Sequence, residues 1–330
     1  MKKYLALLLL FWVLLANSGG CEPDAAMAAS ALPAALRAGE PSAVYMTTDI
    51  SPRGLMNAYK ALDRKPSGRV AVKVHTGELE KSNYLRPAFI RELVREVGGT
   101  LVECNTAYGG TRAETAMHRQ IAKDHGFTAV AKMDIMDEKG SMILPVVGGT
   151  RLSTNYVGEN FKNYDFFVVL SHFKGHRMGG FGGALKNISI GIASAKGKSW
   201  IHSGGKALSG LGGPNTEQNA FLEGMAEAAK SISDSLGNGE RILYVNVMNR
   251  LSTVCDCSAN PDEPDMHDIG ILSSLDPVAL DRACVDLIYA APDGQSMINR
   301  IEERNGAYIL THAEKIGLGS RAYRLVSLDG

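Results

Sequence analysis

Apolar and polar residues follow two different patterns along the chain, one typical of strands and one typical of helices. Short β-branched runs predict buried strands, and they cover residues 70–74, 101–104, 142–147, 166–171 and 242–247. Stretches with an apolar residue every three or four positions predict helices over residues 87–97, 112–125, 221–236 and from Pro277 onward. Strands that alternate with helices are typical of an α/β fold with a mostly parallel sheet flanked by helices. Such sheets bind ligands beyond the carboxyl ends of their strands, so residues that directly follow a strand are the first candidates for function.

The first residues have a different pattern, typical of an export signal. Lys2 and Lys3 precede an apolar run over residues 5–16, which is shorter than the roughly 20 residues of a membrane-spanning helix. Cys21 follows small residues directly behind this run, which predicts a bacterial lipoprotein signal over residues 1–21 and membrane attachment through a lipidated Cys21. Secretion with cleavage near residues 26–28 and an uncleaved anchor are the alternatives. Residues 22–41 are rich in Ala and Pro and predict a flexible tether, which leaves residues 42–330 for the α/β domain.

Composition and charge narrow the function classes. The 330 residues include 35 Lys and Arg against 35 Asp and Glu, so the formal net charge is zero. This balance argues against nucleic-acid binding through a basic surface. Five Cys are too few for a scaffold built from disulfides, and 45% hydrophobic residues suffice for an ordinary globular core. We expect one large folded unit; whether it divides into two lobes stays open.

The densest group of reactive side chains lies between residues 171 and 202. Its glycines cannot stabilise a regular element, so they predict a loop whose backbone N–H groups approach an anion, with a helix starting near Ala184. The predicted ligand-binding residues here are Lys174, Gly179, Gly180, Gly182, Gly183 and Asn187. His172, His176, Lys186 and His202 lie around this loop and predict a site for a small anionic ligand or a metal ion. The alternative is a Gly-rich turn whose histidines only bind backbone.

A second group of reactive side chains is Cys255-Asp256-Cys257. Thiolates at this spacing bind soft metals, although two of them make only half of a tetrahedral site. Oxidation of the pair, two inert thiols, and pairing of one of them with Cys104 are the alternatives in an exported protein. His75 directly follows the strand over residues 70–74 and is expected at the same edge of the sheet.

The sequence resembles the family called domain of unknown function 362 over about residues 70–288. The segments that carry this resemblance are residues 70–74, 105–108, 125–128, 171–176, 180–187, 255–257, 268–272 and 276–281. Many members of that family are described as iron–sulfur proteins, with a Cys-rich motif after the part that matches residues 201–203. Here residues 203–221 contain no Cys, so the usual ferredoxin-type 4Fe–4S clusters are not expected. The cofactor stays unknown, with a transition metal as one candidate.

A more distant resemblance is to the nickel-pincer lactate racemases. The matching positions are His176, the glycines of residues 179–183, Lys186 and His202. The resemblance implies a lactate-racemase-like fold, with His176 as an acid/base group, Lys186 as the amine that attaches the cofactor, His202 as a metal ligand and His75 nearby.

These observations give one reading with three alternatives. The main interpretation is an exported protein that binds a metal ion or a small anionic ligand, with redox or isomerase-like chemistry if it is an enzyme. The predicted catalytic residues are His176, Lys186 and His75, and the predicted metal ligands are His172, His202, Cys255, Asp256 and Cys257. The alternatives are an isomerase or racemase acting next to a carboxylate, a non-catalytic ligand-binding lipoprotein, and an iron–sulfur electron-transfer protein.

Overall fold

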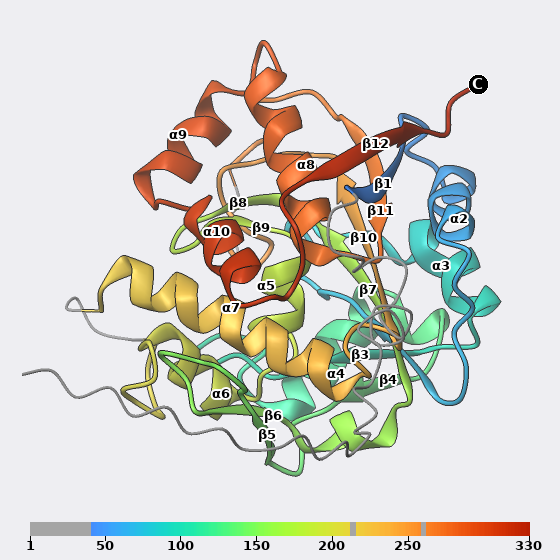
Figure 1. Cartoon of the computed structure of the whole chain (residues 1–330). Coiled ribbons are helices and arrows are strands. Elements are labelled where there is room, and N and C mark those ends of the chain that lie inside the picture. Colours follow the sequence, from blue (N-terminus) through green and yellow to red (C-terminus); the bar gives the residue numbers. More distant parts are fainter. Residues whose placement is uncertain (1–40, 212–215, 259–261) are drawn as a thin grey trace, which may run out of the picture.

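An eight-stranded sheet forms the centre of the computed structural model, which describes residues 41–211, 216–258 and 262–330 (Figure 1). In spatial order the strands are β12 (Tyr323–Ser327), β1 (Ser42–Thr47), β11 (Gly270–Ser274), β10 (Ile242–Met248), β7 (Phe166–His172), β2 (Val70–Lys73), β3 (Thr100–Glu103) and β4 (Met133–Ile135). The five strands from β10 to β4 are parallel, whereas β11 runs antiparallel to both of its neighbours. The prediction of a mostly parallel α/β sheet is therefore confirmed.

Helices cover both faces of this sheet because its central strands are apolar on both sides. In β7, Phe167 and Val169 belong to one buried cluster, and Phe166 and Val168 belong to the other. Successive strand residues point to opposite faces, so each face has its own core. The first core packs against α5 (Ala184–Ser189), α7 (Gln218–Ser235) and α8 (Pro277–Ala290), and the second packs against α2 (Pro52–Ala61) and α3 (Pro87–Glu96) (Figure 1).

Most predicted elements occur close to their expected positions, but one strand lies elsewhere. The run at residues 142–147 forms β5 (Ser141–Pro145), which pairs with β6 (Thr154–Gly158) in a separate two-stranded antiparallel sheet. Ile143 at the centre of β5 is 57% exposed, unlike the fully buried residues of β7. A strand with an exposed side can pair with its sequence neighbour in a hairpin and needs no crossover helix.

The remaining elements are α4 (Thr115–Asp124), α6 (Ala195–His202), α9 (Gln295–Glu303), α10 (Tyr308–Lys315), the 3-10 helices η2 (Phe127–Ala129) and η3 (Glu159–Asn163), and the small hairpin of β8 (Lys174–His176) and β9 (Gly180–Gly182). They include α6 and the β8–β9 hairpin, which contribute residues to the cavity described below. Asp276 begins α8 as predicted, because its carboxylate accepts the backbone N–H groups of Val278 and Ala279 at 2.8 and 3.1 Å.

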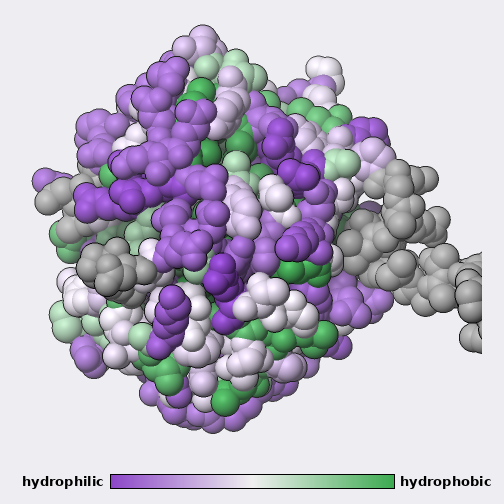
Figure 2. Space-filling model, turned by 60° about the vertical axis from the view of Figure 1, so that its left-hand side comes forward, coloured by the Kyte–Doolittle hydropathy of each residue, from purple (hydrophilic) through white to green (hydrophobic). Residues whose placement is uncertain are grey.

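The outer surface is mixed in character. Hydrophilic side chains dominate the face drawn in Figure 2, and hydrophobic ones occur there in small separate groups. Among the described residues, no helix is both long and apolar enough to cross a membrane. The predicted signal peptide, Cys21 and the tether up to residue 40 lie outside the described residues.

Candidate functional site

The carboxyl ends of four parallel strands open into one cavity of about 330 Å³. His75 follows β2, Tyr108 follows β3, Lys174 follows β7 and Cys255 follows β10, and all four line this cavity. Parallel strands end at the same edge of a sheet, so residues far apart in sequence meet there. This is the edge at which the sequence predicted the site.

Positive charge dominates the cavity. The cationic residues that line it are Lys73, Arg112, Lys174, Arg177, Lys186 and Lys198. Glu103 is the one acidic residue among the described residues that line the cavity. A concave site lined mainly by one sign of charge attracts ligands of the opposite sign. The cavity therefore favours anions.

Lys73 and Arg112 are held by the buried carboxylates of Glu103 and Glu78. Glu103 lies 3.7 Å from the Lys73 ammonium and 3.6 Å from the Arg112 guanidinium, which also lies 3.0 Å from Glu78. Burial alone would raise the pKa of Glu103, but Lys73 and the other nearby cations hold it well below its usual range. Lys73, Glu103 and Arg112 were not predicted as site residues. One sequence feature could have identified such a residue: a charged side chain inside an apolar strand run, such as Lys73 within residues 70–74.

Lys186 differs from these cations because nothing within the described residues pairs with its ammonium. Burial, followed by the nearby Lys174 and Lys73, lowers the Lys186 pKa to about 7. Its aliphatic stem passes over Gly182, where a Cβ atom would lie only 3.1 Å from the Lys186 Cδ atom. Gly182 therefore leaves room for the lysine side chain, and the ammonium remains available to a ligand.

His75 and His176 are neutral hydrogen-bond donors. The Nδ1 atom of His176 accepts the Gly179 N–H at 2.9 Å, and the Nδ1 atom of His75 accepts the Gly77 N–H at 3.1 Å. A backbone N–H can only donate, so the ring proton of each histidine lies on Nε2. Burial and nearby cations hold both pKa values well below the usual range, with Lys186 acting on His176 and Arg112 on His75. Both rings therefore stay neutral near pH 7.

His172 and Asp256 bind each other. The Nδ1 atom of His172 lies 3.0 Å from both Asp256 carboxylate oxygens, and its Nε2 atom lies 2.6 Å from the Asn249 carbonyl oxygen. Asp256 is 0% exposed and also accepts from the Lys174 ammonium at 2.6 Å. Burial raises the Asp256 pKa, but His172 and Lys174 outweigh burial and hold it well below its usual range. Both ring nitrogens of His172 thus have partners within the protein, and the metal-ligand roles predicted for His172 and Asp256 stay predictions.

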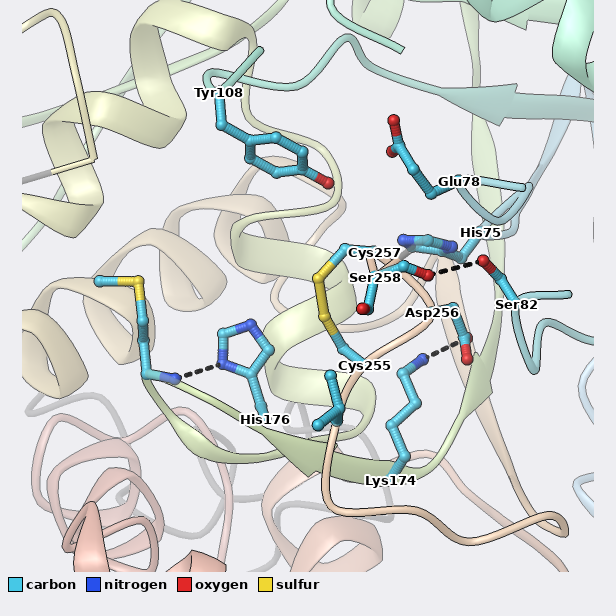
Figure 3. The surroundings of a disulfide bond; sticks show 12 residues. His75, Glu78, Ser82, Tyr108, Lys174, His176, Cys255, Asp256, Cys257 and Ser258 are labelled. Carbon is cyan, nitrogen blue, oxygen red and sulfur yellow. Dashed lines mark hydrogen bonds and ion pairs between the residues drawn. A yellow bond between two sulfur atoms is a disulfide. The ribbon is translucent and has the colours of Figure 1, made fainter. Parts of the chain in front are cut away.

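Cys255 and Cys257 are joined in a disulfide, which is one of the alternatives that the sequence left open. Figure 3 shows this bond between His75 and His176, with the Lys174–Asp256 ion pair beside it. His176, Cys255 and Cys257 each offer one candidate metal-ligand atom, and these atoms lie within 4.8 Å of one another. Metals bind thiolates, so the two sulfurs become ligands only after reduction. Cys104 is buried and free, which excludes its pairing with either residue.

The glycine segment forms a hairpin, and only part of it lines the cavity. Residues 180 and 182 pair with His176 and Lys174 across β8 and β9. Gly179 and Gly180 lie outside the cavity lining, whereas Gly182 and Gly183 belong to it. A Cβ atom on Gly180 would lie 2.8 Å from the backbone of Gly306, so this glycine permits close packing instead of ligand contact.

The N–H groups at the start of α5 are also used by the protein itself. The buried Asp281 carboxylate accepts the N–H groups of Ala184 and Leu185 at 2.8 and 2.9 Å. Burial raises the Asp281 pKa to about 6. The anion that the sequence predicted here is therefore a side chain of the same chain. Asn187 lines the cavity, but its amide donates to the Leu170 carbonyl oxygen at 3.0 Å.

One ring nitrogen of His202 has no hydrogen-bond partner among residues 41–211, 216–258 and 262–330. Its Nδ1 atom lies 2.6 Å from the Lys198 carbonyl oxygen, which can only accept, so the ring proton lies on Nδ1. The ring stacks on Phe221 with centroids 4.8 Å apart, and burial lowers its pKa to about 4. The predicted roles of His202, Lys186, His176 and His75 stay predictions, although all four line one cavity.

Comparisons with known proteins identify similar structures and the family of this chain. The fold is similar to the lactate racemase apoprotein of Thermoanaerobacterium thermosaccharolyticum, with a TM-score of 0.42, 13% identity, and coverage of 75% of this chain and 57% of that chain. It is also similar to a protein from Thermotoga maritima, with a TM-score of 0.42, 12% identity, and coverage of 71% and 57%. The chain thus spans little more than half the length of these structures. No curated protein matches the sequence. The family model described as Domain of unknown function (DUF362) matches residues 70–286, so the chain belongs to this family.

Proposed function

We propose that the protein binds a small carboxylate-type anion in the cationic cavity. The observation that carries this proposal is the Lys186 ammonium, which lies among other cations without a partner in the described part of the chain. The Nε2–H groups of His75 and His176 add neutral donors from the same lining. The volume of about 330 Å³ lies at the lower end of the range for small-molecule sites, which is about 300–1,000 Å³. The ligand is therefore expected to be small.

Calorimetric titration with oxalate, malonate, lactate, phosphate and sulfate tests this proposal. The variant Lys186→Met should weaken binding of the best anion at least tenfold, because a hydrogen bond to a charged group contributes about 1.5–3 kcal/mol. Lys132→Met is a matched control, since it removes the same charge from an exposed position. Unchanged affinity in Lys186→Met, or no binding of any anion to the wild type, would contradict the proposal.

A second candidate is an isomerase that moves a proton next to the carboxylate. The observation that favours it is the Lys186 pKa of about 7, because an amine that gains and loses its proton near neutral pH suits acid/base catalysis. Lys186 and the unprotonated His202 nitrogen also fit the attachment amine and metal ligand of the cofactor that the racemase resemblance implies. Such a group would supply an electron-accepting centre. Incubation of the bound hydroxy acid in deuterated water tests the candidate: deuterium at the α-carbon supports an enzyme, and binding without exchange supports a binding protein.

We also propose that the chain is exported and attached to a bacterial membrane through Cys21. Lys2, Lys3, the apolar run over residues 5–16 and the small residues before Cys21 support this. In cell fractionation, the full-length chain should be found with the membranes, and Cys21→Ser should release it or leave its precursor uncleaved. Equal distribution of the two proteins, with equal processing, would exclude lipidation.

A further inference from the structure

We propose that Cys255 and Cys257 form a redox-active pair that exchanges electrons with a dithiol at the edge of the anion cavity. This function stands on the position of the disulfide and does not require that an anion binds. Both cysteines line the cavity, together with Lys174, His176 and Lys186.

The two cysteine residues differ in their exposure. Cys255 is 2% exposed, whereas Cys257 is partly exposed. Thiol–disulfide exchange begins when a thiolate reaches one sulfur of the bond, and access decides which sulfur it reaches. We therefore assign Cys257 as the sulfur that is attacked and Cys255 as the leaving group.

The surroundings of the pair stabilise a leaving thiolate. A ring nitrogen of His176 lies within 4.8 Å of both sulfur atoms, and the tautomer of this ring carries its proton on Nε2. Figure 3 shows the His176 ring facing the disulfide. Lys174 and Lys186 contribute positive charge to the same cavity. Nearby cations and N–H donors favour the thiolate over the thiol, and a stabilised thiolate leaves faster.

The loop that carries the two cysteines is held by contacts other than the disulfide. His172 and Lys174 bind the carboxylate of Asp256, the residue between the cysteines. The Asp256 carbonyl oxygen accepts the Glu78 N–H at 3.1 Å, and the Cys255 carbonyl oxygen accepts the Ser258 N–H at 2.9 Å. Breaking the S–S bond leaves these contacts intact, so both thiols should stay at the cavity edge, ready to be oxidised again.

The exchange balances as a two-electron reaction. One thiolate of the external dithiol attacks the Cys257 sulfur, and the S–S bond breaks as Cys255 leaves as a thiolate. The second thiol of the dithiol then attacks its own mixed disulfide and releases Cys257. The dithiol becomes a cyclic disulfide, and its two protons pass to the cysteine sulfurs or to solvent.

Thiol trapping under native conditions tests this inference. The full-length protein is equilibrated with mixtures of reduced and oxidised dithiothreitol, quenched and labelled with a maleimide, and peptide masses assign each label. Labels on Cys255 and Cys257 should appear together as the fraction of reduced dithiothreitol in the mixture rises. Cys104 and Cys284 are buried, so they should stay unlabelled until denaturant is added.

Three outcomes would overturn the inference. Label on both cysteines before any dithiol is added would mean that the disulfide is absent, and reduction only in denaturant would mean that it is purely structural. Reduction that cannot be reversed by oxidised dithiothreitol would also exclude a redox couple. Lys186→Met separates this inference from the anion proposal. It should weaken anion binding at least tenfold, whereas the two-thiol transition should persist and only shift toward more reducing dithiothreitol mixtures, because one of the cations that favour the thiolate is gone.

Discussion

The charge of Lys186 sets the expected pH dependence of the site. Its pKa of about 7 means that the amine loses its proton between pH 6 and pH 8, whereas His75, His176 and His202 stay neutral over this range. Anion affinity should therefore fall as the pH rises through about 7. Titrations at pH 6, 7 and 8 measure the fall directly.

Lys186→Arg is the matched variant for this prediction. Arginine remains protonated throughout this range, so the affinity of the variant should vary little with pH. If the anion affinity of Lys186→Arg fell with rising pH as steeply as that of the wild type, a group other than Lys186 would be responsible for the pH dependence.

Asp256 should contribute strongly to stability, because it lies between two buried partners. Asp256→Asn would leave the Lys174 ammonium buried without its carboxylate, and breaking a buried ion pair costs about 3–5 kcal/mol. We expect the free energy of unfolding in urea at pH 7 to fall by about 3 kcal/mol. Asp124→Asn is an exposed control that should change it by less than about 0.5 kcal/mol. A fall no larger than that of the control would contradict the ion-pair assignment.

The sequence predicted which residues gather at the site better than it predicted what each of them does. His172 ends β7, and His176 and Lys186 follow it within 14 positions, so their closeness depends mainly on local order along the chain. The role of His172 depends on Asp256, which lies 84 positions away and reaches it through the packing of β10 beside β7. No local pattern contains that pairing, so a buried ion pair and a metal ligand were indistinguishable in the sequence.

At the scale of elements, the glycines of the β8–β9 hairpin show a similar limit. Their low strand propensity predicted a loop, but close contacts with other backbone segments hold them in a hairpin. Gly175 is the clearest case, since a Cβ atom there would lie 2.5 Å from the Thr253 backbone. The order of strands and helices was easier to predict, because each strand and helix carries its own apolar period.

Gly175→Ala tests the contact between the hairpin and the cysteine loop. The added methyl group should lower the free energy of unfolding by about 1–3 kcal/mol, as overpacking does, and should slow the labelling of Cys255 and Cys257 by displacing their loop. Gly109→Ala is the matched control, because a Cβ atom on Gly109 has no heavy atom within 4 Å. Equal free energies of unfolding of the two variants in urea would show that β8 does not pack closely against the loop that carries the two cysteines.

At the scale of the whole molecule, the proposed anion site and the disulfide share one cavity, although their residues come from different segments of the chain. Lys186 belongs to α5, and Cys255 and Cys257 belong to the loop after β10. Reduction of the pair would place sulfurs that can ionise among the cations of the cavity. A thiolate would compete with the bound anion for the same positive charge.

Reduction should therefore weaken anion binding several-fold, and the anion should in turn favour the disulfide. Linkage requires the two effects to be equal, because both are the same coupling free energy between one pair of sites. The measurement has two halves: calorimetric titration of the oxidised and reduced protein, and the dithiothreitol equilibrium with and without saturating anion. Cys257→Ser cannot form the disulfide, so its anion affinity should not respond to dithiothreitol. Equal affinities in both redox states would contradict the coupling and would mean that the two sites act independently. Unequal factors in the two halves would mean that the two measurements do not report on one pair of sites at equilibrium.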